Sequence, residues 1–208
     1  MPESDPTVLV VDDDPAVRES LERVLRSVGL EVRRFASVSD LLKSDPPKGP
    51  TCLVLDVRMP GQSGLDFQAD LAAAGVQVPI VFITSHGDIP MSVRAMKDGA
   101  IEFLTKPCHG QDLIDAVHLG LARDRARRAN EKAMGALRAR FESLSARDRE
   151  IMIQVAQGRL SREIADDIGA SETAVNVRRC KLMRKMNVRS LPELCRMADK
   201  LKLLSEKT

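Results

Sequence analysis

Residues 51–61 have the sequence TCLVLDVRMPG, and this stretch decides the fold of the first half of the chain. Its first five residues, Thr51–Leu55, are almost all apolar, which is typical of a short strand covered on both faces. Further strand candidates are Thr7–Val11, Glu31–Phe35, Pro79–Ile83 and Ile101–Leu104. Segments with helical periodicity separate them, and Gly29 ends the first of these. Five repeats of strand then helix predict an α/β domain with a doubly wound, five-stranded parallel sheet.

The second half of the chain is predicted to be all helical. Between about Gly110 and Arg140 apolar residues recur every three to four positions, which predicts a helix that continues as a linker and could pair with another subunit. A solvated, partly frayed linker is the alternative. Beyond it, Leu144–Leu204 predicts four short helices, with a tight turn at Gly169–Ala170 between the second and third. Helix, tight turn and helix is an arrangement that places the later helix in the major groove of DNA. We expect domains at 1–122 and 143–208, with the helical linker at 123–142.

Charge is distributed unevenly along the chain. Residues 1–120 carry 11 basic and 18 acidic side chains, a net charge of −7, whereas residues 121–208 carry 21 and 12, a net charge of +9. A basic half indicates a polyanionic partner, although charge can also serve only solubility. The chain has neither Trp nor Tyr, which argues against proteins that stack single-stranded bases on aromatic platforms.

The cellular compartment is predicted from what the sequence lacks. Residues 1–7 do not have the pattern of a signal peptide, and the longest apolar runs are too short to span a bilayer. The four cysteines are widely spaced and form no metal-binding pattern, so reduced thiols are expected. We expect a cytoplasmic protein without membrane contact.

Polar residues gather where the predicted strands end. They are Asp12, Asp13 and Asp14 after the first strand, Asp56 after the third, Thr84 at the end of the fourth and Lys106 after the fifth. Each alone is compatible with a helix cap or a turn, but doubly wound folds collect their ligand site at this edge. A divalent cation such as Mg²⁺ relieves the repulsion between clustered carboxylates. A carboxylate beside it can act as a nucleophile and form an aspartyl-phosphate.

The same residues resemble a known family. Val10–Asp14, Leu55–Gly61, Ser63-Gly64, Thr84 and Lys106-Pro107 resemble the motif set of response-regulator receiver domains. Ile83–Met91 and Ala95–Ala100 narrow the resemblance to the NarL/FixJ family, near the regulators of nitrogen fixation and styrene catabolism. The resemblance implies a two-component response regulator whose Asp56 is phosphorylated by a sensor histidine kinase, with Mg²⁺ (or Mn²⁺) as cofactor.

The resemblance also implies a role for each residue of the acidic site. Asp56 is the phosphoacceptor, and Asp13, Asp56 and the backbone carbonyl of Arg58 hold Mg²⁺, with Asp12 assisting through water. Lys106 contacts the phosphoryl group, and Thr84 moves toward it.

The resemblance implies further roles for residues around this site. Phe103 is the switch aromatic that turns inward, a role compatible with a plain core position. The Lys106-Pro107 peptide is expected to be cis, and Asp14 to cap the first helix. We hypothesise that Arg58 and His86 set the lifetime of the phosphoryl group.

In the basic half, Leu144–Arg147, Gln157-Gly158, Ile164-Ala165, Ser171 and Lys185-Met186 resemble the LuxR-type helix-turn-helix. In its third helix the spacing predicts a core side made by Val175, Leu182 and Met186. The candidate DNA-binding residues are Thr173, Asn176, Val177, Arg178, Arg179, Cys180, Lys181, Arg184 and Lys185. An amphipathic helix with a solvated basic face is the alternative.

The helix departs from its relatives at some positions. Many relatives have Thr where this chain has Ala174, and His where it has Arg178. Cys180 is a poor hydrogen-bond donor. A target DNA sequence therefore cannot be carried over from the relatives. Pairing of the final helix around Leu191–Leu204 would give a two-fold dimer on a roughly palindromic site.

The predicted function is that of a phosphorylation-activated transcription factor. Phosphorylation promotes a homodimer, for which Val93, Met96 and Lys97 are candidate contacts, and sequence-specific binding to double-stranded promoter DNA, with RNA polymerase as a partner. Release of inhibition across the linker is an alternative route. The protein is not expected to be an enzyme beyond its own phosphotransfer and autodephosphorylation.

Two other functions are alternatives to this one. One is a regulator that works without phosphorylation. The other is a phosphohydrolase, which needs an acid or base beside the nucleophile, where this chain has Val57 and Arg58.

Overall fold

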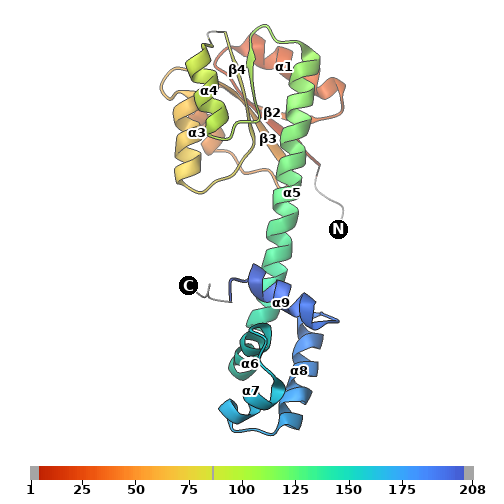
Figure 1. Ribbon diagram of the computed structural model, residues 1–208. Coiled ribbons are helices and arrows are strands. Elements are labelled where there is room, and N and C mark those ends of the chain that lie inside the picture. The colour runs from red at the N-terminus through yellow and green to blue at the C-terminus, as the bar shows by residue number, and fades with distance from the viewer. Residues whose placement is uncertain (1–4, 86, 204–208) are drawn as a thin grey trace. The chain divides into compact units, whose positions relative to one another are not determined.

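The structure, a computed structural model, describes residues 5–85 and 87–203 (Figure 1). The chain divides into two compact units, Met1–Arg128 and Ala129–Thr208. One helix, α5 (Gly110–Glu142), contributes to both. The helix runs without a break through the segment predicted as a helical linker.

The first unit is built on a parallel sheet. The strands are β1 (Thr7–Val11), β2 (Glu31–Phe35), β3 (Thr51–Asp56), β4 (Ile80–Thr84) and β5 (Glu102–Thr105). Their order in the sheet is β2-β1-β3-β4-β5, so the order reverses between β1 and β3, where doubly wound folds bind ligands. The predicted strands are confirmed, with three corrections of one residue. β3 includes Asp56, and β4 and β5 each begin and end one residue later than predicted, because backbone pairing rather than side-chain polarity sets strand ends.

Helices cover both faces of this sheet. They are α1 (Pro15–Ser27), α2 (Val38–Leu42), α3 (Gly64–Ala73) and α4 (Ile89–Lys97), together with α5. Helices α1 and α5 pack on one face, against a core that includes Val8, Val54 and Val81. Helices α2, α3 and α4 pack on the other face, around Leu9, Leu55 and Phe82 (Figure 1). Every residue of β1, β3 and β4 is buried, which explains their almost unbroken apolar sequences.

The second unit is helical. It contains α6 (Ala146–Ala156), α7 (Ser161–Ile168), α8 (Glu172–Met186) and α9 (Leu191–Lys200). Ser145 and Ser171 cap α6 and α8, and left-handed Gly169 makes the predicted turn between α7 and α8. The last turns of α5 join the same core through Leu137. The final helix was predicted to extend to Leu204, but α9 ends at Lys200, and Leu204 lies outside the described residues.

Among the helices of the described residues, none combines the length and apolar character needed to cross a bilayer.

Candidate functional site

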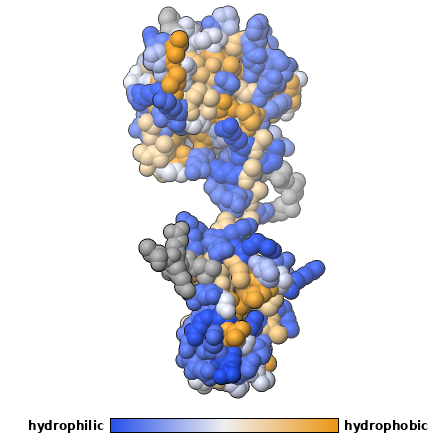
Figure 2. Space-filling view, viewed as in Figure 1, coloured by the Kyte–Doolittle hydropathy of each residue, from blue (hydrophilic) through white to orange (hydrophobic). Residues whose placement is uncertain are grey.

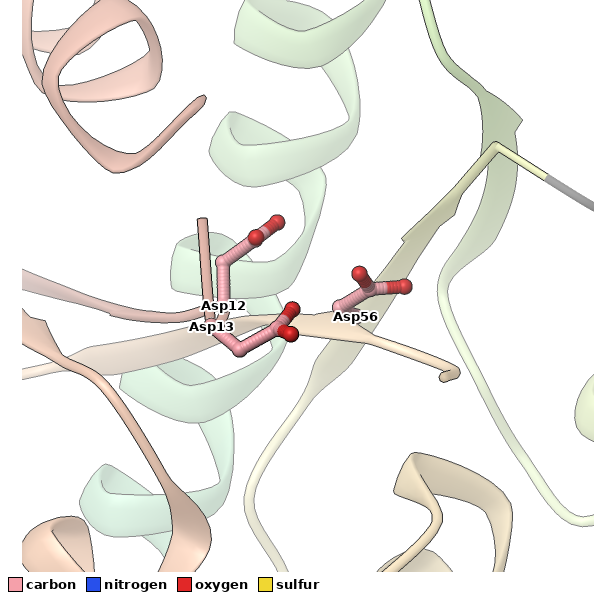
Figure 3. A group of neighbouring side chains, drawn as sticks. All are labelled: Asp12, Asp13 and Asp56. Carbon is pink, nitrogen blue, oxygen red and sulfur yellow. The ribbon is translucent and has the colours of Figure 1, made fainter. Parts of the chain in front are cut away.

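The carboxyl ends of β1 and β3 bring three acidic residues together. Asp12 and Asp13 follow β1, and Asp56 is the last residue of β3, which pairs with β1 in parallel register (Figure 3). Each offers one carboxylate oxygen, and these oxygens all lie within 4.8 Å of one another. Asp12 and Asp56 are buried, whereas Asp13 is exposed. A set of hard oxygen donors, one of them open to solvent, fits Mg²⁺ or Mn²⁺.

Lys106 contributes the positive charge of this site. Its Nζ donates to Asp12 Oδ2 at 2.5 Å and to Asp56 Oδ2 at 2.8 Å. Burial by itself would lower the pKa of Lys106, but these two hydrogen bonds outweigh it and raise the pKa. Three carboxylates and one ammonium leave a net charge of about −2, which a divalent cation would neutralise.

Asp12 is held on both of its oxygens. Its Oδ2 accepts from Lys106, and its Oδ1 accepts from the Asp14 backbone N–H at 3.0 Å. Burial raises the pKa of Asp12, against the opposing effect of these hydrogen bonds. Asp14 itself caps α1 by accepting from the Ala16 N–H at 2.8 Å, as predicted. Hydrogen bonds on both oxygens hold the Asp12 side chain in place, whereas the Asp13 side chain is exposed to solvent.

A glycine lets α3 pack closely against the backbone of Asp56, the candidate phosphoacceptor. A Cβ atom added to Gly64, at the start of α3, would lie 2.3 Å from the Asp56 carbonyl oxygen, far inside van der Waals contact. The neighbouring Arg58 N–H donates to Asp56 Oδ1 at 3.1 Å. Gly64 belongs to the motif set found in the sequence, but only the structure shows that it packs against the backbone of Asp56.

The other edge of the site is formed by β4 and β5. Thr84 is buried, and its backbone carbonyl accepts from the Lys106 N–H at 2.8 Å. The Lys106-Pro107 peptide is cis, as predicted. Phe103 is half-buried, and a Cβ on Gly87 would lie 2.7 Å from its ring and 3.2 Å from the Thr84 methyl group. The loop after β4 therefore lies directly against Thr84 and Phe103. His86 lies outside the described residues.

Comparison with known proteins identifies this arrangement. Residues 8–118 match the response regulator receiver domain, and residues 142–198 match the luxR family of bacterial regulatory proteins. The chain belongs to the response regulators. It pairs a receiver domain with a LuxR-type DNA-binding domain, so it acts as a transcription regulator and not as a conventional enzyme. This confirms the predicted family and fold class.

The relatives of this response regulator match it over nearly its whole length. Nodulation protein W of Bradyrhizobium diazoefficiens is 47% identical over 97% of this chain and 88% of that protein. The transcriptional regulatory protein FixJ of Azorhizobium caulinodans is 43% identical over 95% and 93%. A solved structure of the response regulator StyR matches with a TM-score of 0.85 and 46% identity, covering 95% of this chain and all of that one.

In this response regulator, α8 has the two sides expected of a recognition helix. Val175, Leu182 and Met186 are buried, as predicted. Of the nine candidate DNA-binding residues Arg179 is half-buried, and the other eight are exposed. The viewed face of the helical unit carries mostly hydrophilic residues, with small apolar patches between them (Figure 2).

Some of the basic candidates on α8 already have partners inside the protein. Arg178 Nη1 donates to Asp148 Oδ1, on α6, at 3.2 Å. Burial by itself would raise the pKa of Asp148, but hydrogen bonds from Ser145 and Arg178 outweigh it and lower the pKa. Asp148 is not among the residues predicted from the sequence, although its position three residues after the cap Ser145 marks it as part of the α6 N-terminus.

Proposed function

We propose that Asp56 accepts a phosphoryl group from the phosphohistidine of a sensor histidine kinase. The observation that supports this best is the position of its buried carboxylate, 2.8 Å from Lys106 Nζ and beside Asp12 and Asp13. An Asp56 oxygen forms the new bond to phosphorus, while the bond from phosphorus to the kinase's histidine nitrogen breaks and its electron pair stays on nitrogen.

The surrounding residues stabilise the transferred group. Lys106 pairs with a phosphoryl oxygen in place of the Asp56 oxygen that it contacts now, and the Thr84 hydroxyl donates to another. Asp13, Asp56 and the Arg58 carbonyl would hold Mg²⁺ (or Mn²⁺), with Asp12 acting through water. The bound ion would supply charge neutralisation for the incoming phosphoryl group. In the same site, slow autodephosphorylation ends the signal, and Arg58 influences its lifetime.

The switch reaches a face suited to dimerisation. Thr84 shifts toward the phosphoryl group and Phe103 turns inward, which changes the surface formed by α4 and β5. On α4, Val93 and Met96 are apolar yet 45% and 43% exposed, and Lys97 is exposed beside them. A homodimer would cover these side chains, and pairing of α9 would present two α8 helices to a palindromic site.

The output is regulated transcription. In this proposal the receiver domain (1–122), the linker (123–142) and the DNA-binding domain (143–208) act in the cytoplasm on double-stranded promoter DNA, with RNA polymerase as a further partner. The exposed basic residues of α8 contact phosphates, and the residues at its centre contact base edges.

The test compares the wild type with Asp56→Ala by footprinting on the host's whole genomic DNA, with acetyl phosphate and Mg²⁺ as phosphoryl source. Asp45→Ala, which removes an exposed carboxylate in the loop between α2 and β3 and outside the acidic site, is the matched control. We expect the wild type and the control to gain occupancy on phosphorylation and Asp56→Ala to show no gain. Equal gains in all three proteins would support regulation without phosphorylation at Asp56.

A further inference from the structure

Helices α7 and α8 are joined by a chain of three polar side chains. Arg179 Nη1 donates to Ser161 Oγ at 2.5 Å, and Ser161 Oγ donates to Asn176 Oδ1 at 2.8 Å. Ser161 is the first residue of α7 and is only 8% exposed, whereas Asn176 is exposed on α8. The chain therefore runs from a half-buried arginine, through a buried hydroxyl, to a side chain on the candidate DNA-binding face.

Each of the two hydrogen bonds that join these side chains has a defined direction in the structure. A guanidinium has donors but no acceptor, so Ser161 Oγ must accept from Arg179. Ser161 keeps its single hydroxyl hydrogen, and the structure directs that hydrogen at the amide oxygen of Asn176. The amide nitrogen of Asn176, with two N–H donors, is left for a partner other than Ser161 and Arg179.

This orientation matters for base recognition. An asparagine recognises adenine by accepting from N6 with its oxygen and donating to N7 with its nitrogen. Here the oxygen is turned toward Ser161 on α7 and one of its lone pairs is taken, so the amide nitrogen, a donor, is the group left to face DNA. Guanine presents two adjacent acceptors, N7 and O6, in the major groove, whereas adenine presents an acceptor and a donor.

We propose that Ser161 is a positioning residue for specificity, which holds Asn176 with its donors outward so that the protein prefers guanine to adenine at the base that Asn176 faces. The proposal rests on the proposed DNA contact of α8. Ser161 touches no base in this scheme and acts through Asn176 alone.

The test is selection of randomised duplex DNA by the full-length protein, treated with acetyl phosphate and Mg²⁺. Asn176→Ala identifies the position that Asn176 contacts, as the one position in each half-site where selectivity relaxes. At that position we expect the wild type to favour guanine over adenine by at least about fivefold. Ser161→Ala should shift the preference toward adenine, because the amide can then turn and use both of its groups.

Two further variants separate positioning from folding. Ser161→Thr keeps the hydroxyl and should retain the guanine preference of the wild type. Arg179→Met leaves Ser161 intact but removes the guanidinium that occupies one lone pair of its oxygen, so Ser161 can accept from the amide nitrogen more readily, and the preference should shift toward adenine as in Ser161→Ala. This second route tests the proposal even if Ser161→Ala does not fold.

The possible results are distinct. Adenine selected by the wild type, no relaxed position in Asn176→Ala, or unchanged base preference in both Ser161→Ala and Arg179→Met would overturn the proposal while leaving sequence-specific DNA binding intact. If neither the wild type nor any variant enriches a DNA sequence, that result would instead contradict the proposed function.

Discussion

Asp124 on α5 offers a sharp test of how the receiver domain is held together. It is 1% exposed and accepts hydrogen bonds from the Thr51 backbone N–H at 2.9 Å, from Arg127 Nη2 at 2.5 Å and from Arg128 Nε at 2.6 Å. Thr51 begins β3, the strand that Asp56 ends. One buried carboxylate therefore fixes the start of the strand that carries the phosphoacceptor candidate.

The change Asp124→Asn keeps the side chain's shape and removes its charge. An amide oxygen in the place of Oδ2 can still accept from Thr51 and Arg128, but the amide N–H groups then face the donors of Arg127. Breaking a buried ion pair costs about 3–5 kcal/mol. The two arginine side chains are 28% and 35% exposed and can turn toward water, which reduces the cost. We expect a loss of about 2–3 kcal/mol in the free energy of unfolding at pH 7.

The assay is urea unfolding followed by circular dichroism, because the chain has no Trp or Tyr to report by fluorescence. Hydrogen exchange of the β3 amides assigns the loss to the receiver unit. Asp115→Asn, an exposed carboxylate on the same helix, is the control and should change stability by less than about 0.5 kcal/mol. A loss in Asp124→Asn no larger than that of the control, or unchanged exchange of β3, would refute the reasoning.

The pH dependence has a defined sign. Burial by itself would raise the pKa of Asp124, but hydrogen bonds from Arg127, Arg128 and Thr51 outweigh it and lower the pKa below its usual value of 3.8. A carboxylate with a lowered folded-state pKa contributes stability above that usual value and loses it as the pH falls through the folded-state pKa. The difference between wild type and Asp124→Asn should therefore stay constant from pH 7 to about 4 and shrink below it.

Three further predictions follow from other contacts. Lys106→Met removes the ammonium between Asp12 and Asp56, so Mg²⁺ should bind roughly tenfold more tightly by calorimetry. Phosphorylation of that variant should no longer raise DNA affinity, and unchanged Mg²⁺ affinity would show that the ammonium does not oppose the ion. Gly64→Ala should lower the free energy of unfolding by about 1–3 kcal/mol and slow phosphorylation, because the new methyl group meets the Asp56 carbonyl. Gly75→Ala is the control: its left-handed backbone (φ 70°) also disfavours a side chain and should cost stability, but a Cβ there meets no atom within 4 Å, so the phosphorylation rate should not change. Asp148→Ala frees Arg178 and should raise affinity for any DNA sequence about two- to fivefold at low salt, measured by fluorescence anisotropy of labelled DNA. An affinity that does not change would mean that Arg178 makes no DNA contact.

Local sequence patterns were sufficient for much of the fold. Apolar runs such as Thr51–Leu55 are strands covered on both faces, and the spacing of Val175, Leu182 and Met186 marks the buried side of α8. Caps such as Ser145 and Ser171 were also predictable, because a cap needs only a side-chain oxygen and the next few backbone N–H groups. Strand ends were predicted only to within one residue, because hydrogen-bond pairing with neighbouring strands decides where each strand ends.

For the candidate site, too, one part could be predicted from the sequence and another part could not. Asp12, Asp56 and Lys106 could be assigned to one edge from sequence, because parallel strands bring their carboxyl ends together. Tertiary structure alone decided that Lys106 lies between two carboxylates, that Gly64 packs on the Asp56 backbone and that Ser161 directs Asn176. These contacts join residues from different elements, at separations of up to 94 positions. Local periodicity carries no information about such distances, so only the packed chain defines the direction of each hydrogen bond.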